Sequence, residues 1–78
     1  MSLKDRIALN VLAYCNDNDI KLINLAKRLH CGLPKVTKML DIKERTRRFT
    51  LNDIDNICDA LGVPPEVIIT YDKRKRDD

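Results

Sequence analysis

The three cysteines and the single histidine are the residues whose spacing says most directly what chemistry they can perform. Zinc is held by four thiolate or imidazole ligands, usually arranged as two close pairs such as Cys-x-x-Cys. Here Cys15, Cys31 and Cys58 are widely separated, and His30 is the only histidine. The spacing therefore predicts no metal site and no cofactor. We expect reduced cysteines that act as small hydrophobic residues, and a histidine that lies in a turn.

The acidic residues of one segment offer a second candidate chemistry. Asp53, Asp55 and Asp59 lie close together in the sequence, and the last two are one helical turn apart. Paired carboxylates can bind a metal ion or perform acid-base catalysis. No second ligand set, no nucleophile–base pair and no phosphate-cradling glycine loop accompanies them. We therefore expect a solvated helix face, and the sequence predicts that the protein is not an enzyme.

The basic residues are concentrated in the middle of the chain. Residues 27–48 contain eight lysines and arginines against two acidic residues, Asp41 and Glu44. Residues 49–66 contain four acidic residues and no basic one, although the whole chain carries only +3. Such a concentration is typical of a surface that contacts phosphates. A merely solvated basic face has the same composition, so charge alone leaves both interpretations open.

Hydrophobic periodicity indicates that short helices position these residues. Apolar side chains recur at three- and four-residue steps over residues 3–15, 22–29, 33–40, 51–61 and 65–69, which is the pattern of helices with one buried face. The chain has 78 residues and shows neither strand-like alternation nor an internal repeat. We therefore expect one compact all-α domain of five helices over residues 1–71, followed by a charged tail over 72–78.

Local signals mark several of the helix ends. Thr50 and Asp53 fit the capping pattern in which a threonine precedes an acidic residue by three positions. Gly62 follows the last apolar residue of the same helix, as a C-terminal capping glycine does. Pro34 falls in the first turn of its helix, where its missing N–H costs nothing. The four residues 16–19 prefer turns and end the first helix.

Residues 22–40 are the most informative stretch, because they form a helix, a three-residue break and a second helix. Ala26 supplies the small residue that lets the second helix cross close to the first. Gly32 lies at the break, where it can either adopt an unusual φ or cap a helix. The apolar residues that would fix the crossing angle are Leu25, Leu29, Cys31, Val36 and Met39. The stretch therefore predicts a helix-turn-helix unit.

These residues give the chain a resemblance to the phage-repressor family of helix-turn-helix domains, the Cro and CI-type or XRE-like domains. The resemblance covers residues 5–69 and rests on Leu25-Ala26-Lys27-Arg28-Leu29, on Val36-Thr37-Lys38-Met39 and on the run from Thr50 to Glu66. It implies a five-helix lambda-repressor-like fold and a transcriptional regulator that binds double-stranded DNA. Four features differ from the usual family pattern. Leu22 replaces a glutamine, His30 replaces the glycine of the turn, and Leu33 and Pro34 replace polar residues at the front of the second helix of the motif. The connector after that helix is also longer than usual and lacks the common Glu and Gly.

The resemblance also implies roles for individual residues. The second helix of the motif, residues 33–40, would be the recognition helix in the major groove. The residues that would face base edges are Gly32, Leu33, Pro34, Thr37 and Lys38. Those that would contact flanking phosphates are Lys27, Arg28, Lys35, Lys43, Arg45, Arg47 and Arg48. Because Leu33 and Pro34 lack polar groups, they fit thymine methyl groups, a protein-binding patch, or simply the start of a helix.

The expected partners are double-stranded DNA and a second copy of the chain. The family's C-terminal segment implies a homodimer, with candidate interface residues Val67, Ile68, Ile69 and Tyr71; the alternative is that these residues only complete the core of the domain. The alternative is an antirepressor-like module of the same fold that binds a partner protein, such as a repressor, rather than DNA. The apolar Leu22, Leu33 and Pro34 would suit that role. Because no apolar run is long enough to cross a membrane, we expect a cytoplasmic protein with neither a membrane nor a small-molecule partner.

Overall fold

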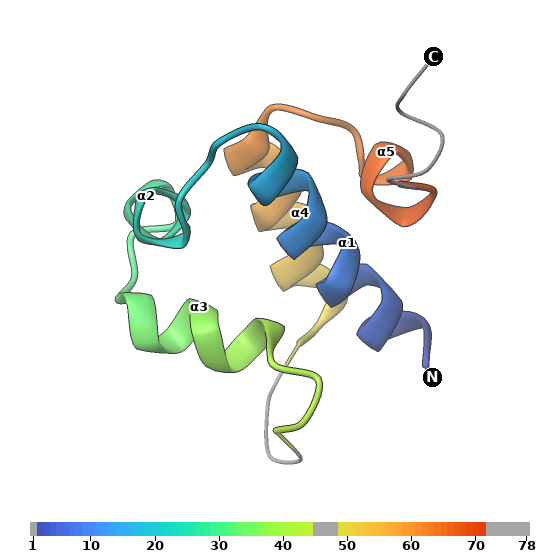
Figure 1. Ribbon diagram of the computed structural model, residues 1–78, viewed down its shortest axis with the longest axis horizontal. Coiled ribbons are helices and arrows are strands. Elements are labelled where there is room, and N and C mark those ends of the chain that lie inside the picture. Colours follow the sequence, from blue (N-terminus) through green and yellow to red (C-terminus); the bar gives the residue numbers. More distant parts are fainter. Residues whose placement is uncertain (1, 45–48, 72–78) are drawn as a thin grey trace.

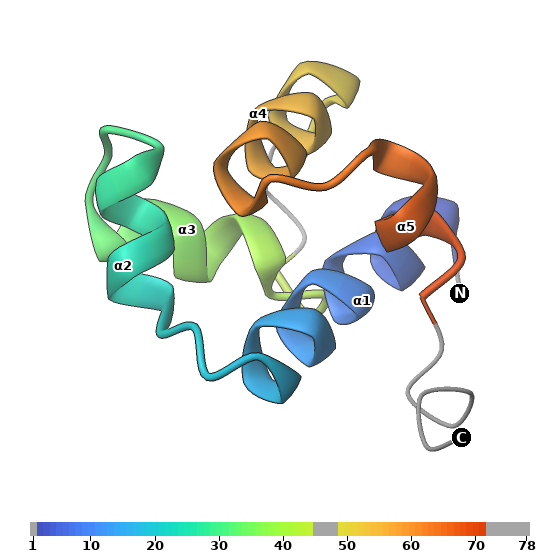
Figure 2. The same cartoon turned by 90° about the horizontal axis from the view of Figure 1, so that it is seen from above.

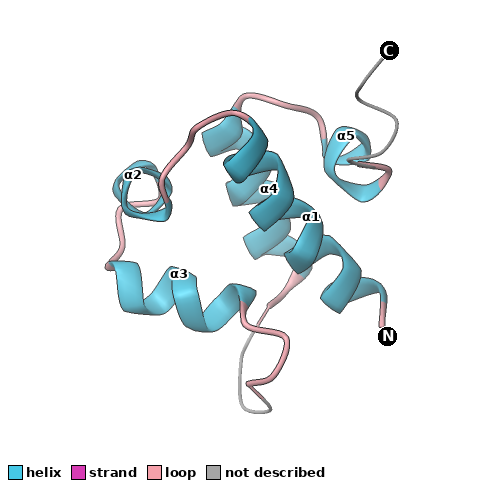
Figure 3. Ribbon diagram, viewed as in Figure 1, coloured by secondary structure: helices cyan, strands magenta, loops and turns pink. Residues whose placement is uncertain are grey.

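The computed structural model describes residues 2–44 and 49–71. Over these residues the chain forms five helices and no strand, as Figure 3 shows. The helices are α1 (Leu3–Asp17), α2 (Leu22–Arg28), α3 (Leu33–Leu40), α4 (Leu51–Leu61) and α5 (Pro65–Ile69). The all-α fold class predicted from the sequence is confirmed.

The helices are arranged around α1 and α4, which lie between the other three (Figures 1 and 2). The pair α2 and α3 lies on one side and α5 on the other, so these elements occupy opposite ends of the long axis of the molecule. α3 contacts both α1 and α2, whereas α5 contacts α1 and α4. The molecule measures 36 × 27 × 18 Å. The helix-turn-helix unit is thus held at one end of the domain.

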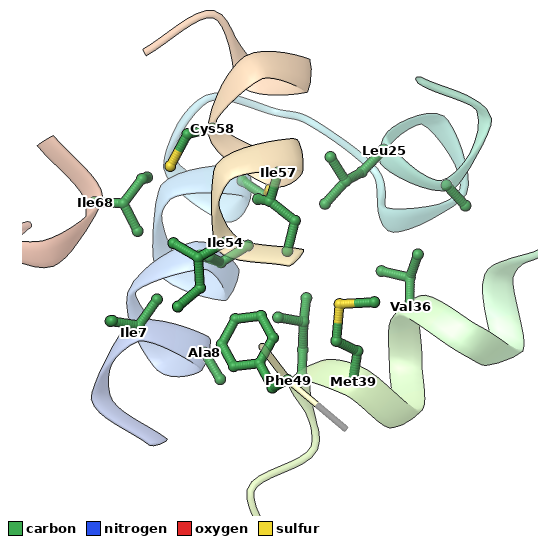
Figure 4. Close-up of a cluster of buried hydrophobic side chains, with 14 residues drawn as sticks. Ile7, Ala8, Leu25, Val36, Met39, Phe49, Ile54, Ile57, Cys58 and Ile68 are labelled. Atoms are coloured by element: carbon green, nitrogen blue, oxygen red, sulfur yellow. The ribbon is translucent and has the colours of Figure 1, made fainter. Parts of the chain in front are cut away.

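One hydrophobic core joins all five helices. Leu25, Val36, Ile57 and Ile68 are almost completely buried and come from four different helices. The remaining core residues are Ile7, Ala8, Val11, Cys15, Ala26, Met39, Leu40, Phe49, Ile54 and Cys58. Figure 4 shows these side chains converging from separate helices. Because each helix buries one face in the same cluster, the position of α3 depends on the packing of the whole domain.

The ends of α4 follow the sequence signals closely. The Thr50 hydroxyl accepts a hydrogen bond from the Asp53 N–H at 3.2 Å, and the Asp53 carboxylate accepts one from the Thr50 N–H at 3.0 Å. These reciprocal bonds satisfy two N–H groups that the first turn leaves without helical partners. At the other end, Gly62 adopts the left-handed conformation with φ of 73°. The predicted cap and C-terminal glycine are both confirmed.

The end of α1 lies two residues beyond the predicted one. The backbone N–H and the side-chain amide of Asn18 both donate to the Tyr14 carbonyl, at 3.1 and 2.8 Å. Because these bonds satisfy a carbonyl that the helix end would otherwise leave open, α1 continues to Asp17. The chain then reverses through Asp19, which has φ of 56°.

The turn between α2 and α3 places its left-handed residue at His30 rather than at Gly32. His30 has φ of 57°, whereas Gly32 is extended with φ of −81° and forms the N-cap of α3. Of the two roles predicted for Gly32, an unusual φ or a helix cap, the structure shows the cap. In the left-handed region the β-carbon lies too close to the following carbonyl oxygen, so His30 is strained there and a glycine would not be.

Replacing His30 with glycine is therefore expected to stabilise the domain. The gain should be roughly 0.5–1 kcal/mol, because relief of strain exceeds the entropy that glycine adds to the unfolded chain. Urea unfolding measures this difference, and a His30→Gly domain no more stable than the wild type would contradict it. Gly32→Ala is the control and should change stability by less than about 0.5 kcal/mol, since the new β-carbon would meet Pro34 Cδ at an ordinary 3.6 Å.

Candidate nucleic-acid interface

The helices α2 and α3 pack against each other through small and fully buried side chains. Leu25 and Ala26 of α2 and Val36 of α3 are each at most 1% exposed. Because the side chain of Ala26 is a single methyl group, α3 can approach α2 closely. The turn between them is closed by a hydrogen bond of 3.0 Å from the Cys31 N–H to the Ala26 carbonyl. These contacts form the helix-turn-helix unit that the sequence predicts.

The two long faces of α3 have opposite character. The buried face consists of Val36, Met39 and Leu40. On the other face Pro34, Lys35, Thr37 and Lys38 are exposed, Leu33 is half-buried, and Gly32 is exposed at the N-terminal end. The five residues predicted to face base edges are thus brought together on one accessible surface, which we call the α3 face. The helix carries two lysines and no acidic residue, so this surface is electropositive.

Thr37 is restrained within the α3 face by its own helix. Its hydroxyl donates a hydrogen bond of 3.0 Å to the carbonyl of Leu33, one turn earlier. A threonine in a helix commonly makes this bond, which directs the hydroxyl hydrogen toward the backbone. The side chain therefore presents its methyl group and the oxygen lone pairs, rather than a hydrogen-bond donor, to whatever contacts the α3 face.

The residues predicted to contact phosphates fall into two groups. Lys27, Arg28, Lys35 and Lys43 belong to the described part of the chain, and all four are exposed. Lys43 follows α3 in a turn where its backbone N–H donates to the Asp41 carboxylate at 2.9 Å. The other three predicted residues, Arg45, Arg47 and Arg48, lie outside the described residues. Lys27 and Arg28 lie in the last turn of α2, Lys35 lies on α3, and Lys43 lies just beyond α3.

Arg28 has a structural contact that the sequence did not indicate. Its Nη1 donates to the backbone carbonyl of Ala60 at 3.0 Å and so links the end of α2 to the last turn of α4. Because Ala60 lies 32 residues further along the chain, no local pattern could have revealed the pair. A guanidinium has five N–H donors, so this bond is compatible with a phosphate contact by the same side chain.

An apolar groove lies beside the α3 face. Its lining residues are Leu9, Leu12, Leu22, Thr37, Leu40, Asp41, Ile42 and Lys43. Leu22 stands where the family usually has a glutamine. In this structure it is half-buried and packs against the core. The first residue of α2 therefore contributes apolar surface and no polar group to this end of the molecule.

Polar contacts attach α5 and the residues after it to α1. The side-chain amide of Asn10 donates to the Ile68 carbonyl at 2.8 Å, near the C-terminal end of α5. The Tyr71 hydroxyl donates to the Asp17 carboxylate, and its ring meets that of Tyr14 edge to face with centroids 5.6 Å apart. These contacts fix which side chains α5 leaves at the surface.

The predicted dimer residues differ in accessibility. Ile68 is fully buried in the core of its own domain, so it has no surface left to offer a second copy, and we correct the prediction at this position. Val67 and Ile69 are exposed, at 37% and 40%. Tyr71 is half-buried against α1. An interface at α5 would therefore rest on Val67 and Ile69.

The cysteines behave as packing residues. All three are free, and Cys15 and Cys58 are buried. Burial raises the pKa of both thiols; the Asp55 and Asp59 carboxylates raise the pKa of Cys58 further, and the Arg28 guanidinium partly offsets the rise for Cys15. A thiol with a raised pKa stays protonated at neutral pH. The prediction that cysteines serve as small hydrophobic residues is confirmed for these two.

The described part of the chain contains neither a metal-ligand cluster nor a membrane-spanning helix. Over 2–44 and 49–71, no three His, Cys, Asp or Glu side chains gather as metal ligands would. Every helix in that part of the chain is too short or too polar to cross a bilayer. The α3 face is consequently the strongest candidate site in the described part of the chain.

Comparison with known proteins connects the chain to a family of DNA-binding domains. No match was found among curated proteins or among solved structures. Residues 9–74, however, match the family described as the Cro/C1-type HTH DNA-binding domain, where HTH stands for helix-turn-helix. The match spans most of α1 and all of α2 to α5. The chain therefore belongs to the Cro/C1-type helix-turn-helix DNA-binding domain family.

Proposed function

We propose that the domain is a sequence-specific regulator of transcription that binds double-stranded DNA as a symmetric dimer, with α3 as its recognition helix. The observation that carries this proposal is the α3 face, an exposed and electropositive helix surface held rigidly by a buried opposite face. A helix with its side chains is about 10–12 Å across, and the major groove of B-DNA is about 12 Å wide. An exposed α3 therefore has dimensions that suit insertion into the groove.

The basic residues on the α3 face and next to it have two proposed roles. Lys38 lies in the last turn of α3, and its ammonium group suits the O6 and N7 acceptors of guanine. Lys27, Arg28, Lys35 and Lys43 are proposed to contact phosphates, which fixes the register of the protein on the duplex without reading sequence. In this arrangement specificity depends on few side chains, and affinity depends strongly on salt.

The proposed dimer rests on α5. Val67 and Ile69 are its exposed apolar side chains, and α5 lies at the opposite end of the long axis from the helix-turn-helix unit. Two copies joined through α5 would leave both recognition helices free. Dimers of this kind of protein contact successive half-sites about 34 Å apart, which is the spacing that a dimer joined through α5 would have to match.

Selection of binding sites from a random duplex library tests the proposal. We expect enrichment of a sequence with two half-sites related by two-fold symmetry and about one helical turn apart. Enrichment of a single unsymmetrical site would contradict the dimer but not the sequence specificity. A library that stays random after repeated rounds would contradict sequence-specific binding itself.

A further inference from the structure

The front of the α3 face lacks the polar side chains that usually read base edges. Leu33 and Pro34 begin the helix; Leu33 is half-buried and Pro34 is exposed. Neither side chain can donate or accept a hydrogen bond, and Pro34 also lacks a backbone N–H. The side chains of this part of α3 can therefore recognise a base in the major groove only through apolar contact.

Thr37 extends the apolar surface by one turn. It lies four residues after Leu33 and three after Pro34, so the three side chains share one side of the helix. Its hydroxyl hydrogen is engaged with the Leu33 carbonyl at 3.0 Å. The methyl group of Thr37 is therefore the part of this side chain that can add to the surface formed by Leu33 and Pro34.

Thymine is the base whose major-groove edge carries a methyl group. We infer that the surface formed by Leu33, Pro34 and Thr37 selects thymine at its contact positions through the C5-methyl group, and that Lys38 selects a guanine nearby. Lys38 lies four residues beyond Pro34, about 6 Å along the helix axis, which corresponds to about two base-pair steps of 3.4 Å. This inference rests on the proposed function, because it specifies what the recognition helix reads.

Replacement of thymine by deoxyuridine in the selected DNA site tests this inference. Uracil keeps the pairing edge and the O4 acceptor of thymine and lacks only the methyl group, so any effect reports on that group. Each contacted thymine should weaken binding about fourfold when replaced, which is the effect expected for burial of one methyl-sized group. The readout is the dissociation constant of the full-length protein for each singly substituted duplex at fixed salt.

Two variants of Thr37 separate its methyl group from its hydroxyl. Thr37→Val keeps the methyl group and should retain both the affinity and the sensitivity to deoxyuridine. Thr37→Ser keeps the hydroxyl and should lose about fourfold in affinity for the thymine duplex. Replacing the thymine that Thr37 contacts with deoxyuridine should then cause no further loss of affinity. The reverse order, with Ser like wild type and Val weakened, would overturn the inference.

The possible failures point to different conclusions. Specific binding that is equally strong with thymine and deoxyuridine at every position would overturn the methyl contact and leave the proposed function intact. A protein that selects no DNA sequence would remove the proposed function itself, and with it the basis for this inference.

Discussion

Replacing Lys35 and Lys38 together with glutamate is expected to weaken DNA binding by roughly 100-fold or more. Loss of a base or phosphate contact costs about 1–3 kcal/mol, and reversal of the charge adds repulsion from the phosphates. Both lysines are exposed, so the fold should persist. At the level of the helix dipole, a glutamate is favourable at the first turn and unfavourable at the last, so the two effects on α3 roughly cancel. Fluorescence anisotropy with a labelled duplex measures the loss.

The control is a pair of exposed cations on another helix. Lys4→Glu and Arg6→Glu in α1 change the net charge by the same amount, and both residues are exposed. If the effect at α3 came only from long-range attraction, the two double variants would lose affinity equally. We expect the α1 pair to lose far less, and equal losses would count against α3 as the contacting helix. Circular dichroism of both variants checks that they remain folded.

Replacing Leu25 with alanine is expected to destabilise the domain by about 2–5 kcal/mol. Leu25 is fully buried and is directed toward Ile57 of α4 (Figure 4), so its truncation leaves a cavity where α2 meets the rest of the core. A domain of this size has a total stability of about 4–12 kcal/mol. The midpoint of thermal unfolding should therefore fall by on the order of 15 °C.

The matched control for Leu25 is the same substitution at an exposed leucine. Leu51 begins α4 and is 76% exposed, so Leu51→Ala should change the free energy of unfolding by less than about 0.5 kcal/mol. Thermal unfolding followed by circular dichroism compares the two variants directly. Similar midpoints for both would mean that α2 is not held by the buried contact that the structure shows, and the rigid placement of α3 would lose its explanation.

The sequence predicted the fold well where short-range signals determine it. The periodicity gave the limits of α3 and α5, and the Thr50 cap and Gly62 gave those of α4, because each signal acts within one or two turns. The end of α1 was missed because the side chain of Asn18 continues the hydrogen bonding of the helix. Residue type left Gly32 with two roles, an unusual φ or a cap; the structure shows the cap, and the left-handed residue of the turn is His30.

The candidate site was predicted less completely than the fold. The spacing of Val36, Met39 and Leu40 correctly separated the buried face of α3 from the exposed one. Contacts between distant parts of the chain were beyond local reasoning, as the bond from Arg28 to Ala60 shows. The sequence left Ile68 open between a dimer interface and the core, because the composition of α5 does not say which of its three adjacent apolar residues turns inward; the structure buries Ile68. Its burial depends on how α5 docks against α1.

The most direct test of DNA binding is a titration of the protein with random-sequence duplex DNA at several salt concentrations, with anisotropy as the readout. The α3 face and its neighbouring cations predict roughly micromolar binding at low salt that weakens steeply as salt increases, because each neutralised phosphate releases counterions. Absence of binding at low salt would contradict the account. The basic residues would then be a solvated surface, and α3 would not be a DNA-contacting helix.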